Sequence, residues 1–506
     1  MIEFAGLRRL ADDSVHSLPA GIRRPSYDRR KLTPRVVHIG AGAFHRCHQA
    51  EYAEDLLEAG ATDCSIYALN LRAPDLGTMI GEQSGLYSRE LRKGNWVERR
   101  VIGSILGGMT VLDANYDPYR LSLQKALARA ANPAVEVISC TVTEKGYCHI
   151  PATGELDLSH PDIVHDITHP DLPDSLPSFL LAVLRRRMSR GATLPVIISC
   201  DNVPGNSSTL RRVVLSLAEK VAPHVVDTLM REAVFPDTVV DRIVPATREE
   251  DIAGLAAATG ILDAGLVVGE PFRMWAIDDR ARDRLPAWDR AGAIFTNKVG
   301  SYEILKMRVV NGIQSNMCQL GFLAGFAFMA DVMADPLMSG FARETIEQEV
   351  ESWLPDTPGI NIPDYIDEAQ RRLTNPALRH SCMQISTDGS RKIRQRLIEP
   401  ILDAHAAGRA TPRLLLGLAG WLQYASGRSL DGASHPISDP LAGEVAALAK
   451  DTGSDYAAYV RAVVGLSTVF PARFAENPVL VGGLTEALHT LREKGVKEAV
   501  RSTLSK

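Results

Sequence analysis

One stretch in the second half of the chain combines a lysine with two amides at short spacing. Lys306, Asn311 and Gln314 are five and three residues apart, and apolar residues recur between them at helical spacing. On a helix with about 100° per residue, the three polar side chains fall within an arc of roughly 140°. A neutral lysine can take the proton of an alcohol, and an amide N–H can hold the developing oxyanion. The stretch predicts a site for alcohol oxidation; the alternative is a helix whose polar residues face solvent.

A glycine turn near the N-terminus predicts a dinucleotide site. Residues 36–39 have the pattern of a short buried strand, Gly40 and Gly42 that of a tight turn, and residues 49–59 that of a helix. In this order, backbone N–H groups at a helix N-terminus face a pyrophosphate. His45 stands where the usual fingerprint has a third glycine, so a plain tight turn is the alternative.

The next predicted strand, residues 65–71, ends beside residues that could distinguish NAD from NADP. Dinucleotide folds often place an acid here for the ribose hydroxyls, and an arginine accommodates a 2′-phosphate. Asp75 could serve the first purpose and Arg72 the second. The alternative is that both side chains simply face water.

Two further buried strands, beginning at residues 135 and 195, also end in polar residues. Glu144 follows the first, and Asp201 and Asn202 follow the second. In open parallel sheets, ligands lie outside the carboxyl ends of the strands. We therefore expect these residues near a ligand, with capping of the loops as the alternative.

Two charged groups later in the chain are open to two interpretations. Asp241 and Arg242 lie in the apolar strand 235–245, where a buried ion pair is either structural or orients a site. Ser390 can cap a helix whose first turns carry Lys392 and several arginines. Cations at a helix N-terminus attract a carboxylate or phosphate, and a solvated charge run is the alternative.

The periodicity divides the chain into two parts. Residues 1–295 alternate strands and helices, and residues 160–177 read as a surface excursion. Residues 296–506 turn helical. The predicted helices of the second part are 300–334, 340–352, 363–373, 390–407, 411–425 and 440–450.

Composition narrows the class of protein. The 506 residues are 45% hydrophobic with a net charge of -5, so a nucleic-acid partner is not expected. The seven cysteines form no C-x-x-C pair, which predicts reduced thiols, no metal site and a cytoplasmic protein. No apolar run long enough for a membrane span or a signal peptide occurs, so no membrane association is expected.

Several of these stretches together resemble the polyol-specific long-chain dehydrogenases, the mannitol dehydrogenase family. Their G-x-G-x-F-x-R-x-H signature is seen here as Gly40, Gly42, Phe44, Arg46 and His48. The segment from Lys306 resembles their K-x4-N-x2-H element. Further similar blocks, in the family's order, are residues 141–147, 199–204, 235–245 and 270–272. The resemblance covers residues 35–425, approximately.

The resemblance implies an α/β fold with a Rossmann-type N-terminal domain, a mainly helical C-terminal domain and an active site in the cleft between them. Lys306 matches the general base, and Asn202 and Asn311 match the amides that hold the substrate oxygen. Asp241 matches an acid of the active-site network, and Glu144 an acid on the proton path. The implied cofactor-binding residues are Gly40, Gly42, Phe44, Arg46, Arg72 and Asn202, and the implied substrate-binding residues are Gln314, Gln384 and Lys392. The family uses no metal, and its members are often monomers, with a dimer as the alternative.

Two departures from the family pattern bear on the substrate. Gln314 replaces the family's histidine, and a glutamine can hydrogen-bond a hydroxyl but cannot relay a proton. Gln384 stands where mannitol-type members carry an arginine. Together with the basic run up to Arg396, Gln384 is similar to the fructuronate reductase (mannonate oxidoreductase) branch, whose substrates carry a carboxylate that suits Lys392 and nearby arginines.

The expected function is therefore an NAD-dependent oxidoreductase, with NADP not excluded, that interconverts a sugar acid of the D-mannonate/D-fructuronate type with its keto form. One alternative is a polyol dehydrogenase of the mannitol 2-dehydrogenase kind. Another is a catalytically impaired NAD-binding protein, suggested by Gln314. A short-chain dehydrogenase, suggested by the Tyr302 and Lys306 spacing, is disfavoured by the chain length and the type of glycine turn.

Overall fold

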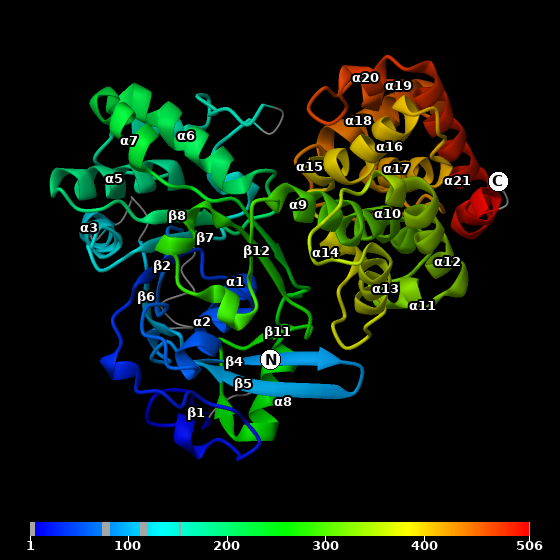
Figure 1. Cartoon of the computed structure of the whole chain (residues 1–506). Helices are drawn as coiled ribbons and strands as arrows, with labels where there is room; N and C mark the ends of the chain where they lie inside the picture. The colour runs from blue at the N-terminus through cyan, green and yellow to red at the C-terminus, as the bar shows by residue number, and fades with distance from the viewer. Residues whose placement is uncertain (1–5, 73–80, 112–118, 151–152, 505–506) are drawn as a thin grey trace. The chain divides into compact units, whose positions relative to one another are not determined.

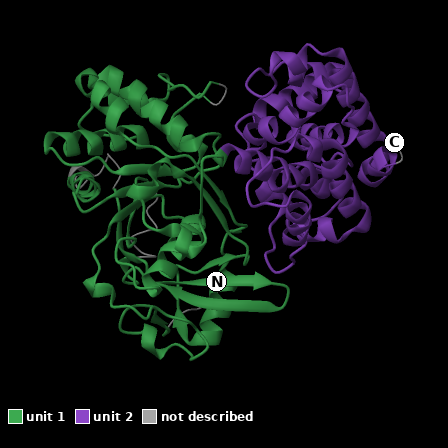
Figure 2. Cartoon of the chain, viewed as in Figure 1, with its two compact units in different colours: residues 1–299 green, residues 300–506 purple. Residues whose placement is uncertain are grey.

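The computed structural model describes residues 6–72, 81–111, 119–150 and 153–504. The chain forms two compact units, residues 1–299 and residues 300–506 (Figure 2). The first contains every β-sheet found among the described residues, and the second is built from helices.

A five-stranded parallel sheet forms the centre of the first unit. Its strand order is β6-β3-β2-β7-β8, so the order reverses beside β2. The strands are β2 (Val36–Ile39), β3 (Ile66–Asn70), β6 (Ile105–Thr110), β7 (Val137–Cys140) and β8 (Val196–Ser199). The carboxyl ends of β2 and β7 therefore flank the switch point at which open α/β sheets bind ligands.

Alternate residues of these strands pack on opposite faces of the sheet, as the period of two in a β-strand requires. Val37 and Ile39 belong to a core that includes residues of helices α3, α5 and α6. Val36 and Ile198 belong to a second core that includes residues of α2. The helices are α2 (Gln49–Glu58), α3 (Tyr119–Ala130), α5 (Leu176–Ser189) and α6 (Asn206–Val221), and Figure 1 shows the last three on one side of the sheet. The predicted Rossmann-type architecture is confirmed.

Three smaller sheets complete the first unit. Their strand orders are β11-β4-β5, β13-β12-β9 and β1-β10. The strands are β1 (Arg8–Arg9), β4 (Tyr87–Lys93), β5 (Trp96–Ile102), β9 (Thr238–Asp241), β10 (Ile261–Leu262), β11 (Val267–Gly269), β12 (Met274–Asp278) and β13 (Ile294–Thr296). The remaining α-helices of this unit are α1 (Ala43–Cys47), α4 (Pro161–Thr168), α7 (Val226–Glu232) and α8 (Glu249–Thr259).

The second unit packs around two buried helices, α10 (Val310–Leu323) and α17 (Pro412–Ala425). Glycines let these helices approach closely, since a Cβ on Gly420 would lie 2.8 Å from Cδ2 of Leu320. The other helices are α9 (Val299–Arg308), α11 (Met329–Ala334), α12 (Pro336–Thr345), α13 (Ile362–Leu373), α14 (Cys382–Ser386), α15 (Gly389–Ile393), α16 (Glu399–Ala406), α18 (Ala442–Thr452), α19 (Tyr456–Val464), α20 (Ala472–Ala475) and α21 (Pro478–Leu504) (Figure 1).

The structure corrects three expectations about the helices. Residues 160–177, expected as a surface excursion, contain α4 and the start of α5. The long helix expected over 300–334 is three helices, interrupted at Val309 and by the turn that contains Gly325. The helix expected over 390–407 contains a π-helical turn, Arg394–Ile398 (η10), between α15 and α16.

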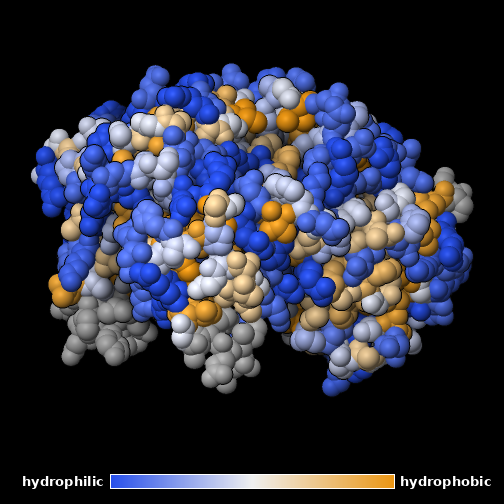
Figure 3. Space-filling view, turned by 90° about the horizontal axis from the view of Figure 1, so that it is seen from below, coloured by the Kyte–Doolittle hydropathy of each residue, from blue (hydrophilic) through white to orange (hydrophobic). Residues whose placement is uncertain are grey.

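The surface drawn in Figure 3 mixes hydrophilic residues with smaller groups of hydrophobic ones. In the part of the chain that the structure describes, no helix combines the length and hydrophobicity that crossing a membrane requires.

Candidate cofactor and substrate sites

A pocket of about 590 Å³ lies at the carboxyl ends of β2, β3 and β7 in the first unit. Its walls come from the turn after β2, the end of β3, the loop after β7, and the segments around α4 and the start of α5. The lining includes Gly40, Gly42, Asn70, Arg72, Thr141, Lys145, Cys148, His160 and Asp162. A crevice at this point of a doubly wound sheet is the place where a dinucleotide binds.

The two glycines of the turn are required for different reasons. Gly40 has a φ of +87°, and a Cβ there would overlap the carbonyl oxygen of Thr141 and lie 2.9 Å from its carbon. Gly42 has a φ of -67°, and its nearest neighbour for a Cβ is the Gly40 oxygen at 3.9 Å. The protein's own packing therefore demands glycine at 40 but not at 42. The bare backbone of Gly42 fits a ligand that approaches closely, as a pyrophosphate does.

Arg46 and Phe44 lie on α1, directly after the turn. Arg46 is 4% exposed and its guanidinium donates to the Ala41 carbonyl at 2.8 Å, while the Tyr87 hydroxyl donates to the Arg46 carbonyl at 2.8 Å. Phe44 stacks on His48 with ring centroids 5.1 Å apart. Arg46 thus supports the turn from inside the protein; contact of either side chain with a cofactor stays a prediction.

Arg72 reaches the pocket from the end of β3. Its guanidinium lies 2.7 Å from an Asp162 carboxylate oxygen and donates to the Asp174 carbonyl at 3.2 Å. The hydrogen bond from Arg72 to Asp162 is the main reason why its pKa is raised. Asp75, the other candidate for cofactor discrimination, lies outside the described residues.

The sequence predicts no metal site, yet three potential ligands meet in this pocket. Ligand atoms of Cys148, His160 and Asp162 all lie within 4.8 Å of one another. Spacing along the chain did not reveal this group, because α4 brings His160 and Asp162 back to Cys148. Since Asp162 carries the ion pair with Arg72, we interpret the group as a wall of the cofactor pocket.

The loops that follow β7 and β8 are tied together by Asp201. Its carboxylate accepts hydrogen bonds from the backbone N–H groups of Val142 at 3.2 Å and Thr143 at 2.9 Å, and from the Tyr147 hydroxyl at 3.2 Å. Burial raises the pKa of Asp201 to about 6, although these hydrogen bonds oppose the rise. Glu144 begins the next turn and is partly buried. The predicted Asn202 follows Asp201 on the exposed side of the loop.

A buried histidine beneath the turn was missed by the sequence analysis. The two ring nitrogens of His38 contact the Ser139 hydroxyl at 2.8 Å and the Thr141 hydroxyl at 2.9 Å, and Thr141 donates to the Gly40 carbonyl at 2.6 Å. Burial lowers the pKa of His38 to about 3, so the ring is neutral at neutral pH. His38 sits inside β2, and only the register with β7 shows that it braces the glycine turn.

Asp241 ends β9 and is 4% exposed. The neighbouring Arg242 forms an ion pair with Glu51 of α2 and donates to the Glu270 carbonyl at 2.8 Å. Arg242 therefore has the structural role that was one of the two interpretations, and its carboxylate partner is Glu51. The active-site role of Asp241 stays a prediction.

In the second unit, Lys306, Asn311 and Gln314 are 4%, 5% and 9% exposed. Lys306 lies near the end of α9, and the two amides lie in the first turns of α10, with Val309 between the helices. The interpretation of this stretch as a helix with polar residues in solvent is therefore wrong. A buried lysine and two buried amides on consecutive helices are residue types that can withdraw a proton from an alcohol and hold its oxygen by hydrogen bonds.

The predicted substrate residues on the following helices have different environments. Gln384 is exposed on the short helix α14. Lys392 on α15 is partly buried, and its ammonium donates to the Thr387 carbonyl at 2.5 Å. The expected helix cap by Ser390 is wrong: its hydroxyl donates to Asp439 at 2.6 Å, and the helix begins after Asp388.

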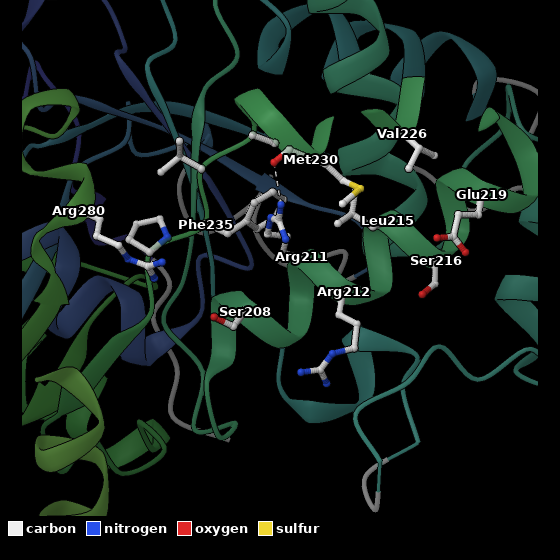
Figure 4. Close-up of a pocket in the computed structure, with 13 residues that line it drawn as sticks. Ser208, Arg211, Arg212, Leu215, Ser216, Glu219, Val226, Met230, Phe235 and Arg280 are labelled. Atoms are coloured by element: carbon white, nitrogen blue, oxygen red, sulfur yellow. Dashed lines mark hydrogen bonds between the residues drawn. The ribbon is translucent and has the colours of Figure 1, made fainter. Parts of the chain in front are cut away.

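A larger pocket of about 780 Å³ lies in the first unit between α6, α7 and the segment that precedes β9 (Figure 4). Its apolar floor includes Leu215 and Met230, and none of the predicted site residues lines it. The arginines at its edge bond the protein itself: Arg211 donates to the Met230 carbonyl at 3.0 Å, and Arg212 to the Gly154 carbonyl at 3.3 Å. It shares no lining residue with the pocket at the carboxyl ends of β2, β3 and β7, so we assign no part of the chemistry to it.

Comparison with known proteins places both halves of the chain in one family. Residues 34–290 match the mannitol dehydrogenase Rossmann domain, and residues 298–492 match the mannitol dehydrogenase C-terminal domain. The D-mannonate oxidoreductase of Escherichia coli (strain K12) is 35% identical over 483 residues, which cover 95% of this chain and 97% of that protein. The uncharacterized oxidoreductase YeiQ of the same organism is 35% identical over 489 residues, covering 96% of this chain and 98% of that protein.

A solved structure gives the same result. The Pseudomonas fluorescens mannitol 2-dehydrogenase, in a ternary complex with NAD and D-mannitol, superposes with a TM-score of 0.90 and 31% sequence identity. The match covers 98% of this chain and 100% of that chain. The resemblance inferred from the sequence motifs is confirmed, and the chain belongs to the mannitol dehydrogenase family of oxidoreductases.

Proposed function

We propose that the protein is an NAD-dependent oxidoreductase that interconverts a sugar acid of the D-mannonate type with its keto form. Family membership supports the reaction class, and similarity to a D-mannonate oxidoreductase supports the substrate class. The observation that carries the proposal is the burial of Lys306, Asn311 and Gln314 on the consecutive helices α9 and α10. A lysine in this position can exchange a proton with the hydroxyl of a bound substrate.

The chemistry follows from these side chains. Lys306 takes the proton of the substrate hydroxyl, and the amide N–H group of Asn311 holds the oxygen as negative charge develops. NAD, when bound, supplies the acceptor for the hydride that leaves the carbinol carbon. In the reverse direction the Lys306 ammonium returns the proton to the carbonyl oxygen. Gln314 holds a neighbouring substrate hydroxyl by a hydrogen bond.

The first unit has the features that a dinucleotide requires. Gly42 leaves the turn after β2 bare where the pocket opens, and the pocket volume of about 590 Å³ lies at the switch point of the sheet. We propose NAD as the cofactor, because the Arg72 guanidinium already binds Asp162, and a 2′-phosphate would have to compete with that carboxylate. Gly40, Gly42 and Arg72 line the pocket that would hold the cofactor.

A polyol dehydrogenase is the second candidate. The solved structure with a TM-score of 0.90 is a mannitol 2-dehydrogenase holding D-mannitol, so the same fold accepts an uncharged polyol. The two candidates differ in whether the substrate carries a carboxylate.

A substrate screen tests the proposal. The purified protein is mixed with D-fructuronate, D-tagaturonate or D-fructose, and the loss of NADH or NADPH absorbance is followed. We expect the highest kcat/KM with a ketouronate and NADH. A preference for fructose would favour the polyol candidate, and the absence of turnover with every substrate would contradict both and support an impaired NAD-binding protein.

A further inference from the structure

The π-helical turn η10 joins two helices of the second unit that carry the proposed catalytic residues. Gln395 donates to the Glu303 carboxylate of α9 at 3.3 Å, and Arg396 donates to the Ser315 hydroxyl of α10 at 3.1 Å. Glu303 lies one turn before Lys306, and Ser315 directly follows Gln314. A π-turn offsets side chains relative to an α-helix and is often found at functional sites. Here it directs consecutive side chains toward α9 and α10.

The guanidinium of Arg396 is held at this position from inside the protein. Arg396 is 8% exposed, and Ser315, whose hydroxyl accepts its hydrogen bond, is 4% exposed. A hydroxyl orients a guanidinium without changing its charge, whereas a carboxylate binds the planar fork of an arginine through two parallel hydrogen bonds.

A second cation, Lys392, also lies near α10, as its effect on Cys318 shows. Cys318 follows Gln314 by one helical turn, and burial raises the pKa of its thiol to about 11. A hydrogen bond from Ser386 lowers that pKa, and so do the charges of Lys392 and Arg396. Both cations are therefore close enough to act on one side chain of α10. Burial and, to a smaller extent, the charge of Lys392 lower the pKa of His380 to about 4, so the His380 ring is neutral at neutral pH.

Resting on the function proposed above, we propose that Arg396, together with Lys392, binds the carboxylate of the sugar-acid substrate beside α10. Arg396 would then be the specificity-determining residue that makes a hexuronate a better substrate than an uncharged ketose. Ser315 would orient the guanidinium, and the π-turn would fix the side chain toward α10.

The same turn contains a matched control. Arg394 belongs to η10 but is 33% exposed at its side chain, where it lies 3.6 Å from the Glu399 carboxylate. Arg394→Gln removes the same charge from the same turn. If the net positive charge of the segment were sufficient, both substitutions would have the same effect.

D-fructuronate and D-fructose form a matched pair of substrates, because a carboxylate in the first replaces a hydroxymethyl group in the second. We expect Arg396→Gln to lower kcat/KM for fructuronate by about 10- to 100-fold, mainly through KM, since hydrogen bonds to a charged group are lost. Arg396→Lys should recover part of the loss, and Arg394→Gln should change the value by less than about threefold. The ratio of fructuronate to fructose kcat/KM should fall in Arg396→Gln.

Three outcomes would overturn this assignment. The first is an equal effect of Arg396→Gln and Arg394→Gln on fructuronate. The second is an unchanged acid-to-ketose ratio in Arg396→Gln. The third is measured in a binding assay that needs no turnover. In this assay we expect D-mannonate, in the presence of NADH, to raise the melting temperature of the wild type but not that of Arg396→Gln. An equal shift in both proteins, or none in the wild type, would contradict carboxylate binding by Arg396.

The failure of this inference can be told from the failure of the proposed function. Wild-type turnover of fructuronate with no selective effect of Arg396→Gln would leave the function standing and remove the role of Arg396. No turnover by the wild type would remove the function, and the melting-temperature assay would still decide whether Arg396 binds a carboxylate. Melting temperatures of the free variants show whether each one folds.

Discussion

Gly40 and Thr141 approach so closely across the ends of β2 and β7 that no side chain fits at residue 40. A methyl group on Gly40 would overlap the Thr141 carbonyl oxygen, and the φ of +87° is unfavourable for any other residue. We expect Gly40→Ala to lower the free energy of unfolding by roughly 2–4 kcal/mol, from strain and overpacking together. Thermal or urea unfolding of the free protein measures this effect.

Gly42 is the matched comparison, because a methyl group there meets nothing nearer than the Gly40 oxygen at 3.9 Å. Gly42→Ala should keep the unfolding midpoint close to that of the wild type. It should raise the Kd for NADH by about 10-fold or more, because the methyl group occupies the approach of the pyrophosphate. Fluorescence titration with NADH gives the Kd. Unchanged NADH affinity in a folded Gly42→Ala protein would argue against a phosphate at this turn.

Asp201 gives the stability a specific pH dependence. Burial raises the pKa of Asp201 from 3.8 to about 6 in the folded protein. Between these values the folded state keeps a proton that the unfolded state has lost, so this contribution to stability is present below pH 4 and is lost as the pH rises to about 6. The unfolding free energy of the wild type, relative to Asp201→Asn, should fall by about 2–3 kcal/mol across that window.

Chemical unfolding of both proteins at several pH values checks this difference. Asp171→Asn serves as the control, since the Asp171 side chain is 91% exposed, and its difference from the wild type should stay flat. If the unfolding free energy of the wild type, relative to Asp201→Asn, rose with pH instead, the hydrogen bonds of Asp201 to the loop after β7 would outweigh the effect of its burial.

Gln314 stands where the family resemblance leads us to expect a histidine, and its substitution separates hydrogen bonding from proton transfer. Gln314→Ala should lower kcat/KM by roughly 10-fold through the loss of one hydrogen bond to substrate. Gln314→His should retain activity and add an ionisation near pH 6.5 to the pH profile of kcat. Identical pH profiles for the wild type and Gln314→His would show that residue 314 does not contact the reacting part of the substrate.

The sequence predicted four of the five strands of the parallel sheet, because their buried residues are contiguous and glycine or polar residues mark their ends; β6 was not predicted. β2 was predicted at its observed bounds, and β3, β7 and β8 within a few residues. The sequence could not show that α4 brings His160 and Asp162 to Cys148, since that proximity depends on a reversal of the chain and not on residue spacing.

The helical unit was predicted less completely. The break at Val309 and the π-turn η10 leave the apolar periodicity almost unchanged, so neither was visible in the sequence. The prediction for Ser390 was wrong for a different reason. A serine beside a basic run suits a helix cap, but the Ser390 hydroxyl donates its hydrogen bond to Asp439, which lies far along the chain. Arg396 was part of an undivided basic run until its contact with Ser315 distinguished it from Arg394.

The central claim is that Lys306 is the base of an NAD-dependent sugar-acid dehydrogenase. The most direct measurement is the turnover of D-mannonate with NAD by Lys306→Ala at saturating substrate, beside the exposed-site control Lys494→Ala. We predict that kcat falls by about 10²- to 10⁴-fold in Lys306→Ala, with NADH affinity and melting temperature retained. The control should keep the wild-type rate. Near-normal turnover by Lys306→Ala at neutral pH would contradict the account.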